Sequence, residues 1–158
     1  MKILLPVDGS SPALQAVAHA LRLTAEGLGA RFVLVNVQEP PSLYEVVVAH
    51  DAEAIERLRA GAGTDLLRDA RAMLDAAGED YEVEIASGEP ASQLIDVLEN
   101  HRCDAVIVGA RGAGKPDAGD LGSVALYLLR HCPVAVTVVR AASPVDAGVE
   151  GAAGSIEV

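Results

Sequence analysis

The residues best suited to chemistry lie in a glycine-rich stretch after an apolar run, VIVGARGAGKPDAGDLGSVA at 106–125. From Gly109 to Lys115 it matches G-x-x-x-x-G-K, the start of a P-loop whose backbone amides bind phosphates. A P-loop has Ser or Thr after the lysine to bind Mg²⁺, but here the next residue is Pro116. The following DAGDLG is not typical of a helix. A P-loop is therefore disfavoured.

A second spacing in the same stretch is more informative. Gly109, Gly112, Gly122 and Ser123 form the pattern G-2x-G-9x-G-S. Glycines let a backbone approach phosphates and adopt positive φ, and a helix that begins at the last pair would add unpaired amides. The pattern predicts an anion site. Two simpler interpretations stay open: Ser123 caps its own helix, and the loop is only a flexible connection.

The elements that would position these residues alternate along the chain. Apolar runs predict strands at 2–7, 31–37, 81–86, 104–109 and 134–140. The strongest runs are almost continuously apolar, as in strands covered on both faces, whereas YEVEIA at 81–86 alternates and indicates an edge strand.

Helical patterns lie between the strands. In 11–28 we expect Ser11 at the N-cap and Pro12 at the first helical position. In 51–77, Gly61 and Gly63 predict a bend or break. Further helices begin at Pro90 and near Gly122, the latter ending about His131. The predicted inward residues are Leu14, Val17, Ala18, Leu21 and Leu28 in the first helix, Ile55, Leu58, Ala62, Leu66, Ala70 and Met73 in the second, and Leu94, Ile95 and Leu98 in the third.

This alternation predicts a parallel sheet with right-handed crossovers and helices on both faces. With strand order 3-2-1-4-5, a ligand would bind where the order reverses, between strands one and four. Asp8 would then face the glycine loop across a cleft. A plain strand-to-helix turn is the other interpretation of Asp8 and Gly9. The connection 38–50 is long, and it could be a lid, a partner surface or a variable loop.

Over about residues 1–140 the chain resembles the universal stress protein (UspA-like) family. The likeness is carried by ILLPVDGS, VLVNV, GEPASQLI, DAVIVGARG and GSVALYLLRHCPVAVTVVR, together with the G-2x-G-9x-G-S pattern of the ATP-binding branch. It implies an α/β fold with a Rossmann-like open five-stranded parallel sheet of order 3-2-1-4-5. It also implies ATP, or AMP or ADP, at the switch point. A homodimer through the last strand, from Val134 to Arg140, is implied as well.

The resemblance assigns binding positions in three groups. Those near the nucleoside are Pro6, Val7 and Asp8, with the backbone of Val37 at the adenine; those near the ribose and phosphates are Val108, Gly109, Arg111 and Gly112; those at the helix start are Gly122, Ser123 and Val124. Arg111 could instead be a solvated loop residue.

One departure from the family pattern affects the phosphates. The spacer AGKPDAGDL carries Asp117 and Asp120 against a single Lys115, where many ATP-binding relatives are basic and aliphatic. The two carboxylates would repel a triphosphate unless they point outward or share a divalent cation with it. We therefore expect nucleotide binding that is weaker or dependent on Mg²⁺.

Composition limits the function classes. The net charge of −11, from 23 acidic and 12 basic residues, argues against binding to nucleic acid or anionic membranes. No apolar run reaches the ~18 residues of a membrane span, and the N-terminus is short for a signal peptide, so a cytoplasmic location is expected. We expect Cys103 and Cys132 to be buried free thiols. Together with His101 and His131 they suggest a zinc site only weakly, because all four lie at the end of the sheet opposite the expected cleft. The tail 141–158 is expected to be mobile.

Three functions stay open. The first is a nucleotide-binding regulatory module of the stress response, at most a slow ATPase, because no general base or water-positioning residue can be named. The second is a dimeric interaction module with weak or no nucleotide binding. The third is an adenylate-transferring or phosphatase-like enzyme on the same scaffold.

Overall fold

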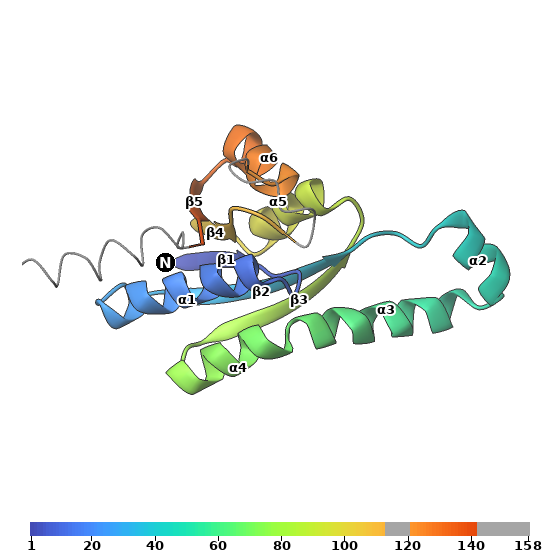
Figure 1. Cartoon of the computed structure of the whole chain (residues 1–158), viewed down its shortest axis with the longest axis horizontal. Helices are drawn as coiled ribbons and strands as arrows, with labels where there is room; N and C mark the ends of the chain where they lie inside the picture. The colour runs from blue at the N-terminus through green and yellow to red at the C-terminus, as the bar shows by residue number, and fades with distance from the viewer. Residues whose placement is uncertain (113–120, 142–158) are drawn as a thin grey trace, which may run out of the picture.

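The computed structural model describes residues 1–112 and 121–141 (Figure 1). Within these residues, strands and helices follow the predicted order, except that three helices lie between the second and third strands. Their bounds are β1 (Lys2–Pro6), α1 (Ser11–Ala25), β2 (Arg31–Gln38), α2 (Leu43–Ala49), α3 (Ala52–Leu66), α4 (Arg68–Ala77), β3 (Tyr81–Ser87), α5 (Pro90–Asn100), β4 (Ala105–Gly109), α6 (Ser123–His131) and β5 (Ala135–Val139). Among them, no helix is both long and apolar enough to cross a membrane.

The five strands form one parallel sheet in the order β3-β2-β1-β4-β5, which confirms the predicted topology. β1 pairs with β2 through Lys2↔Arg31 to Pro6↔Val35, and with β4 through Ile3↔Ala105. The alternating strand β3 lies at an edge, as expected. The strand order reverses between β1 and β4, so their carboxyl ends form the switch point.

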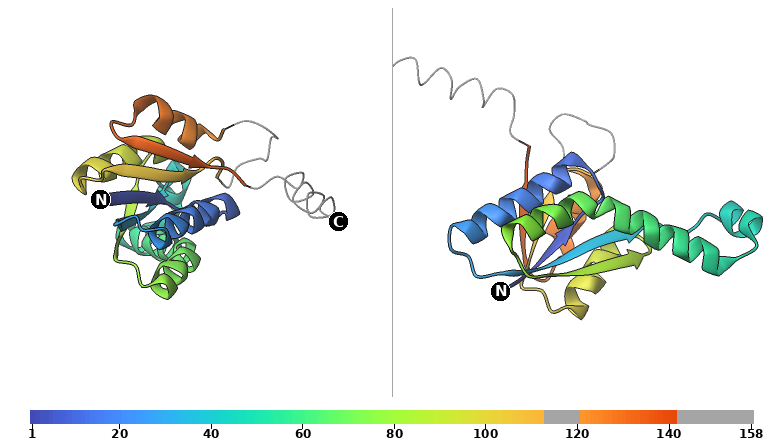
Figure 2. Two further views of the ribbon diagram at one scale, coloured as in Figure 1. Left: turned by 90° about the vertical axis from the view of Figure 1, so that its left-hand side faces the viewer. Right: turned by 90° about the horizontal axis from the view of Figure 1, so that it is seen from below.

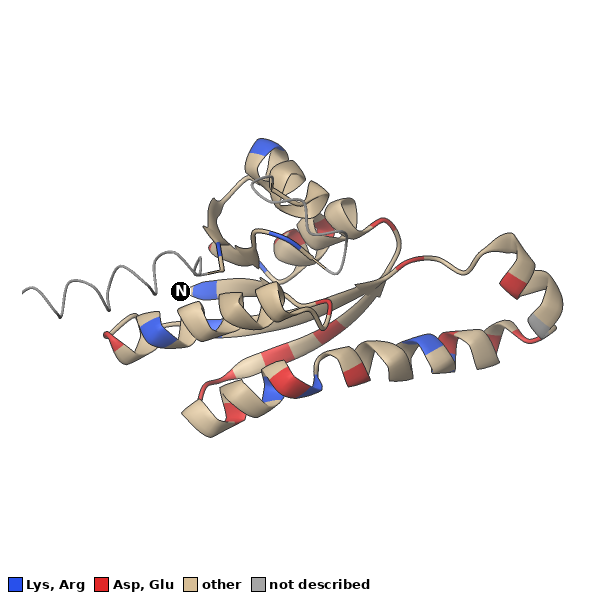
Figure 3. Cartoon of the chain, in the orientation of Figure 1, with Lys and Arg blue, Asp and Glu red and all other residues tan. Residues whose placement is uncertain are grey.

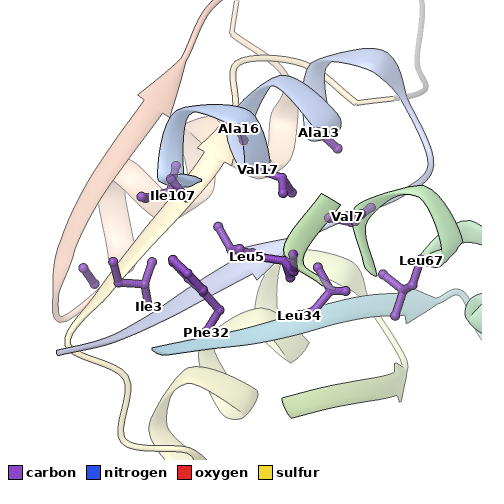
Figure 4. Close-up of a cluster of buried hydrophobic side chains, with 14 residues drawn as sticks. Ile3, Leu5, Val7, Ala13, Ala16, Val17, Phe32, Leu34, Leu67 and Ile107 are labelled. Atoms are coloured by element: carbon purple, nitrogen blue, oxygen red, sulfur yellow. The ribbon is translucent and has the colours of Figure 1, made fainter. Parts of the chain in front are cut away.

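Two apolar layers enclose the sheet. Successive side chains of a strand point to opposite faces, so Ile3 and Leu5 pack with α1 and α4, while Leu4 packs with α5 and α6 (Figure 2). Figure 4 shows the first layer, in which Phe32 and Leu34 of β2 lie beside Ile3 and Leu5 of β1. Burying each large aliphatic side chain contributes roughly 1.5–3 kcal/mol, so these layers hold the carboxyl ends of the strands in place.

The predicted start of α1 is wrong by one residue. Ser10, not Ser11, is the N-cap, and its Oγ accepts a hydrogen bond from the amide of Ala13 at 3.4 Å. The inward face differs from the predicted one as well, because Ala18 is exposed. The fully buried residues of α1 are Ala13, Ala16, Val17 and Ala20, while Leu14, Leu21 and Leu28 are half-buried against the same layer.

The predicted helix 51–77 is two helices, and the break lies at Leu67 rather than at the glycines. Gly63 is buried inside α3, where an added Cβ would lie 2.9 Å from Ile85 Cγ2. Glycine here allows α3 to approach the sheet closely. The predicted inward face is consequently wrong in α3, where Leu58 is 75% exposed. Ala62 and Leu66 are exposed too, and the buried residues are Gly63, Leu67, Ala70 and Leu74.

The connection 38–50 is not a loop throughout, because it contains α2. A capping box begins this helix: Ser42 Oγ accepts from the amide of Glu45 at 3.3 Å, and Glu45 Oε2 accepts from the amide of Ser42 at 2.7 Å. Figure 1 shows α2 and the adjoining end of α3 projecting away from the sheet.

Candidate functional site

Two loops meet at the switch point, one after β1 and one after β4. Because β1 and β4 are neighbours in the sheet, their carboxyl ends place Asp8 beside Gly112. A Cβ on Gly112 would lie 2.6 Å from Asp8 Oδ2. The carboxylate therefore faces the glycine loop, and a side chain at position 112 would close the gap between them.

The loop after β1 is a tight turn that fixes Asp8. Asp8 Oδ1 accepts a hydrogen bond from the amide of Ser10 at 2.9 Å. Gly9 has a φ of 83°, and a Cβ there would lie 2.6 Å from Leu66 Cδ2, so both conformation and space favour glycine. The segment is a strand-to-helix turn that also presents a carboxylate, so its two interpretations are compatible.

The loop after β4 is tied at both ends. The amide of Ala110 donates to the carbonyl of Val139 at 2.8 Å, which extends the pairing of β4 with β5. The carbonyl of Ala110 accepts from the amide of Gly122 at 2.7 Å, so the two ends of the loop are hydrogen-bonded to each other. Gly109 lies under α1, where a Cβ would be 2.7 Å from the carbonyl oxygen of Pro12. Lys115, Asp117 and Asp120 lie outside the described residues, as do residues 142–158 of the predicted tail.

The amino end of α6 opens toward the same place. Its N-cap, Gly122, has no side chain to accept hydrogen bonds, and the carbonyl of Gly122 accepts from the amide of Leu126 at 3.0 Å. The amides of Ser123, Val124 and Ala125 precede that bond, so they have no carbonyl partner within the helix. Among the described residues, three donors and the positive end of the helix dipole are thus available to an acceptor or anion.

These elements surround a cavity of about 430 Å³, within the range of small-molecule sites. The sequence-predicted positions that line it are Pro6, Asp8, Val108, Gly109, Arg111, Gly112, Gly122, Ser123 and Val124. Residues 100 positions apart in the chain are therefore brought to one cleft.

Two predicted positions do not line the cavity. Val7 is 3% exposed; its amide donates to the carbonyl of Val35, and its carbonyl accepts from Asn36 Nδ2, both at 2.8 Å. Its backbone is therefore engaged in holding β1 against β2. Val37 is half-buried and packs against the layer under α5. Neither valine belongs to the cavity wall in this conformation.

Sequence reasoning missed part of the wall, namely Ala13, Glu39, Glu89, Pro90, Ala110 and Ala125. Glu39 follows β2 directly and Glu89 follows β3 after Gly88, so their position at the carboxyl ends of strands was the signal that could have found them. Glu89 Oε2 accepts from the amide of Ser92 at 2.8 Å, and Oε1 from the amide of Ala91 at 3.2 Å. These hydrogen bonds lower the pKa of Glu89, the bond from Ser92 most of all, so it stays ionised.

The cavity wall consequently carries groups of both charges. Asp8, Glu39 and Glu89 supply carboxylates from the loops after β1, β2 and β3. The loop after β4 supplies Arg111, and α6 supplies its amides. A ligand with an anionic end and a hydroxyl-rich end would fit this polarity, because amides donate to anions and carboxylates accept from hydroxyls.

The residues considered for zinc, His101, Cys103, His131 and Cys132, precede β4 and β5 at the amino ends of these strands. His101 is 3.3 Å from the carboxylates of both Glu82 and Glu84 on β3. Burial raises the pKa of the Cys103 thiol to about 11, so it is protonated at neutral pH. Within residues 1–112 and 121–141, no three His, Cys, Asp or Glu side chains are arranged to hold a metal ion.

Comparison with known sequences agrees with this geometry. The sequence profile of the Universal stress protein family matches residues 1–140. The chain belongs to that family. One curated relative, a universal stress protein of Methanocaldococcus jannaschii, is 28% identical over 137 residues, which cover 85% of this chain and 80% of the relative.

Two solved structures are similar in fold. A universal stress protein in complex with cAMP has a TM-score of 0.64 and 25% identity, covering 88% of this chain and 96% of that one. A universal stress protein family protein from Arabidopsis thaliana with AMP bound has a TM-score of 0.66 and 18% identity, covering 90% and 93%. The five-stranded sheet of order 3-2-1-4-5 is therefore the fold of this family.

Proposed function

We propose that this protein binds an adenine nucleotide at the switch point and acts as a nucleotide-dependent regulatory module of the stress response. The observation that carries the proposal is the amino end of α6, which has no side-chain cap among the described residues and opens into a cavity whose wall also carries three carboxylates. Phosphate groups bind well at such helix ends, because the free amides and the dipole both favour negative charge.

The polarity of the cavity also supports one orientation of the ligand. The phosphates would lie against Ser123, Val124 and Arg111, where the donors are. The ribose hydroxyls would then donate to Asp8 or Glu39. Both oxygens of Glu89 already accept from amides of α5. The adenine would lie toward Pro6 and the end of β2, as the family resemblance implies.

Adenine nucleotides in two solved relatives support this choice of ligand. One was crystallised with cAMP and the other with AMP. Both ligands carry a single phosphate. Whether this chain prefers one phosphate or three depends on charge, since three carboxylates line the described cavity wall. We propose that a triphosphate binds with a divalent cation such as Mg²⁺, which would offset that repulsion.

We propose a regulatory role rather than rapid hydrolysis. Pro116 stands where a P-loop NTPase has the hydroxyl that binds Mg²⁺. The glycines and α6 instead resemble a cradle that holds a ligand without acting on it. Nucleotide binding would change partner affinity, and we propose that the homodimer forms by antiparallel pairing of β5, the last strand of the described sheet.

The decisive experiment begins with release and identification of any small molecule that co-purifies. Calorimetric titration of ATP, ADP and AMP into the ligand-free protein, with Mg²⁺ and with EDTA, then measures affinity for each. Gly122→Asp adds a carboxylate beside the α6 amides and should weaken binding at least tenfold. Gly29→Asp is the matched control, because a Cβ there meets nothing within 4 Å.

Three outcomes separate the alternatives. Loss of binding in Gly122→Asp alone supports the site. Equal affinity in wild type and Gly122→Asp means that the nucleotide binds elsewhere. Absence of binding by the wild type under both conditions favours a dimeric interaction module whose cleft takes no nucleotide.

A further inference from the structure

Asn36 is the one buried polar or charged residue within residues 1–112 and 121–141, at 2% exposure. It lies in β2 on the face that also carries Phe32 and Leu34, where an apolar side chain would be expected. Figure 3 shows β2 free of charge after its first residue. Burying an amide is unfavourable unless its polar atoms are hydrogen-bonded, so this residue calls for a specific role.

Both polar atoms of the Asn36 side chain are hydrogen-bonded. Nδ2 donates to the carbonyl of Val7 at 2.8 Å, and Oδ1 accepts from Gln38 Nε2 at 2.6 Å. The carbonyl of Val7 can only accept, so the amide must present its nitrogen to it, which determines the orientation of the side chain. Helix α3 covers this amide, since a Cβ on Gly63 would lie 3.1 Å from Oδ1. Solvent therefore has little access to either bond.

The bond to Val7 marks the point at which β1 leaves the sheet. The ladder of β1 and β2 ends at Pro6↔Val35, and the amide of Val7 makes one more backbone bond, to the carbonyl of Val35 at 2.8 Å. In a continued parallel ladder, the carbonyl of Val7 would accept from a backbone amide of β2. The side chain of Asn36 donates to it instead. Strand β1 can therefore end here without leaving a buried carbonyl unpaired.

The same bond sets the direction in which the chain enters Asp8. The carbonyl of Val7 and the amide of Asp8 belong to one planar peptide group, so holding the oxygen fixes that plane. The chain then turns at Gly9, whose φ is 83°, and Asp8 Oδ1 accepts from the amide of Ser10 at 2.9 Å. Asp8 Oδ2 is the atom that faces Gly112 in the cavity wall. A rotation of the peptide plane would move this carboxylate relative to the glycine loop.

We propose that Asn36 is a positioning residue, which holds the Asp8 carboxylate where it accepts from the ribose hydroxyls of a bound nucleotide. The inference rests on the proposed function, and it assigns the preference for ribose to Asp8 rather than to Glu39. Asn36 itself does not touch the ligand, because it is buried under α3 and does not line the described cavity wall. It acts through the peptide group that follows Val7.

The first test compares ATP with 2′,3′-dideoxy-ATP, which lacks both hydroxyls, by calorimetric titration at a fixed Mg²⁺ concentration. We expect the wild type to bind ATP about tenfold more tightly, as hydrogen bonds to a charged group allow. Asn36→Leu keeps the shape of the side chain but removes the donor, so this preference should fall below about threefold. The affinity for dideoxy-ATP should stay within about twofold of wild type, because that ligand lacks the groups that donate to Asp8.

Two further variants make the comparison specific. Gln38→Met is the matched control, because it removes the donor to Asn36 Oδ1 at similar size and leaves the bond to Val7 in place. The ribose preference should be unchanged in that variant. Asn36→Thr serves if Asn36→Leu does not fold: threonine suits a strand, and its hydroxyl is one bond shorter than the amide. Circular dichroism and urea unfolding establish that each variant is folded.

A double-variant cycle tests whether Asn36 acts through Asp8. Asp8→Asn keeps an acceptor for the amide of Ser10 and replaces the other carboxylate oxygen by a donor, so it should reduce the ribose preference by itself. Adding Asn36→Leu should then cause no further loss, because both changes remove the same interaction. A loss that adds would mean that the two residues act independently, against the proposal.

Other outcomes also contradict the proposal. An unchanged preference in Asn36→Leu and Asn36→Thr, or an equal loss of affinity for both ligands, would leave the bond to Val7 with a structural role only. A preference that Glu39→Gln abolishes and Asp8→Asn retains would assign the hydroxyls to Glu39, and equal binding of both ligands by the wild type would remove the preference altogether. In these cases the nucleotide still binds and the proposed function stands. A wild type that binds neither ligand overturns both.

Discussion

Replacing Gly63 by alanine tests the packing that holds α3 against the sheet. A Cβ at this buried position would lie 2.9 Å from Ile85 Cγ2 and 3.1 Å from Asn36 Oδ1. The first contact is a methyl group of a β-branched side chain, which is stiff at χ1. The second is an oxygen that accepts from Gln38, on an amide whose nitrogen donates to Val7. Neither atom can move away freely.

Two opposing effects determine the sign of the change. Alanine in place of glycine stabilises a helix interior by roughly 0.5–1 kcal/mol. Overpacking a well-filled contact typically costs about 1–3 kcal/mol. Packing should dominate, so Gly63→Ala is expected to lower the free energy of unfolding by about 1–2 kcal/mol. One kcal/mol corresponds to roughly 2–4 °C in melting temperature for a domain of this size.

Gly61 provides the control within the same helix. It is exposed, and a Cβ there would meet nothing within 4 Å. Gly61→Ala should therefore show the helix preference alone and raise the free energy of unfolding by roughly 0.5–1 kcal/mol. Urea and thermal unfolding followed by circular dichroism measure both variants. Equal stabilisation by the two alanines would refute the close approach of α3 to the sheet.

Further predictions concern the ion pairs and the thiols. The Lys2 ammonium, at 2.9 Å, is the main cause that lowers the pKa of Glu82 below 4.5. The ion pair stabilises the fold above pH 4.5, and this stabilisation is lost as the pH falls through the lowered pKa of Glu82. The difference in unfolding free energy between wild type and Glu82→Gln should therefore shrink in acid. Burial of Cys103 predicts that iodoacetamide modifies Cys132 first at neutral pH; mass spectrometry of the native protein identifies the site, and faster labelling of Cys103 would contradict its burial.

Much of the sheet could be predicted because its strands are buried on both faces. Short, continuously apolar runs such as RFVLVNV and DAVIVG predict buried strands, and the alternation of YEVEIA identified the edge strand. The helices were harder, because their inward faces depend on what they pack against. Leu58 has the spacing of an inward residue, yet α3 reaches the sheet only near Gly63, so Leu58 lies beyond the sheet's cover.

The residues of the candidate site were also predicted only in part. The glycine spacing located the loop and the start of α6, since those positions depend on local backbone chemistry. Glu39 and Glu89 were missed because nothing in their immediate sequence marks them; only the alignment of β2 and β3 beside β1 brings them to the cavity. Likewise, Ser42 and Glu45 spell a capping box, but an apolar helix outside the core contradicts the usual expectation.

One guanidinium connects the switch-point cavity with α2. Arg59 donates to the backbone carbonyl of Glu39, a residue of the cavity wall, and it pairs with Glu45 of α2. Thermodynamic linkage makes any coupling through Arg59 reciprocal: a ligand in the cavity that shifts α2 must itself bind more tightly to the shifted form, by the same factor.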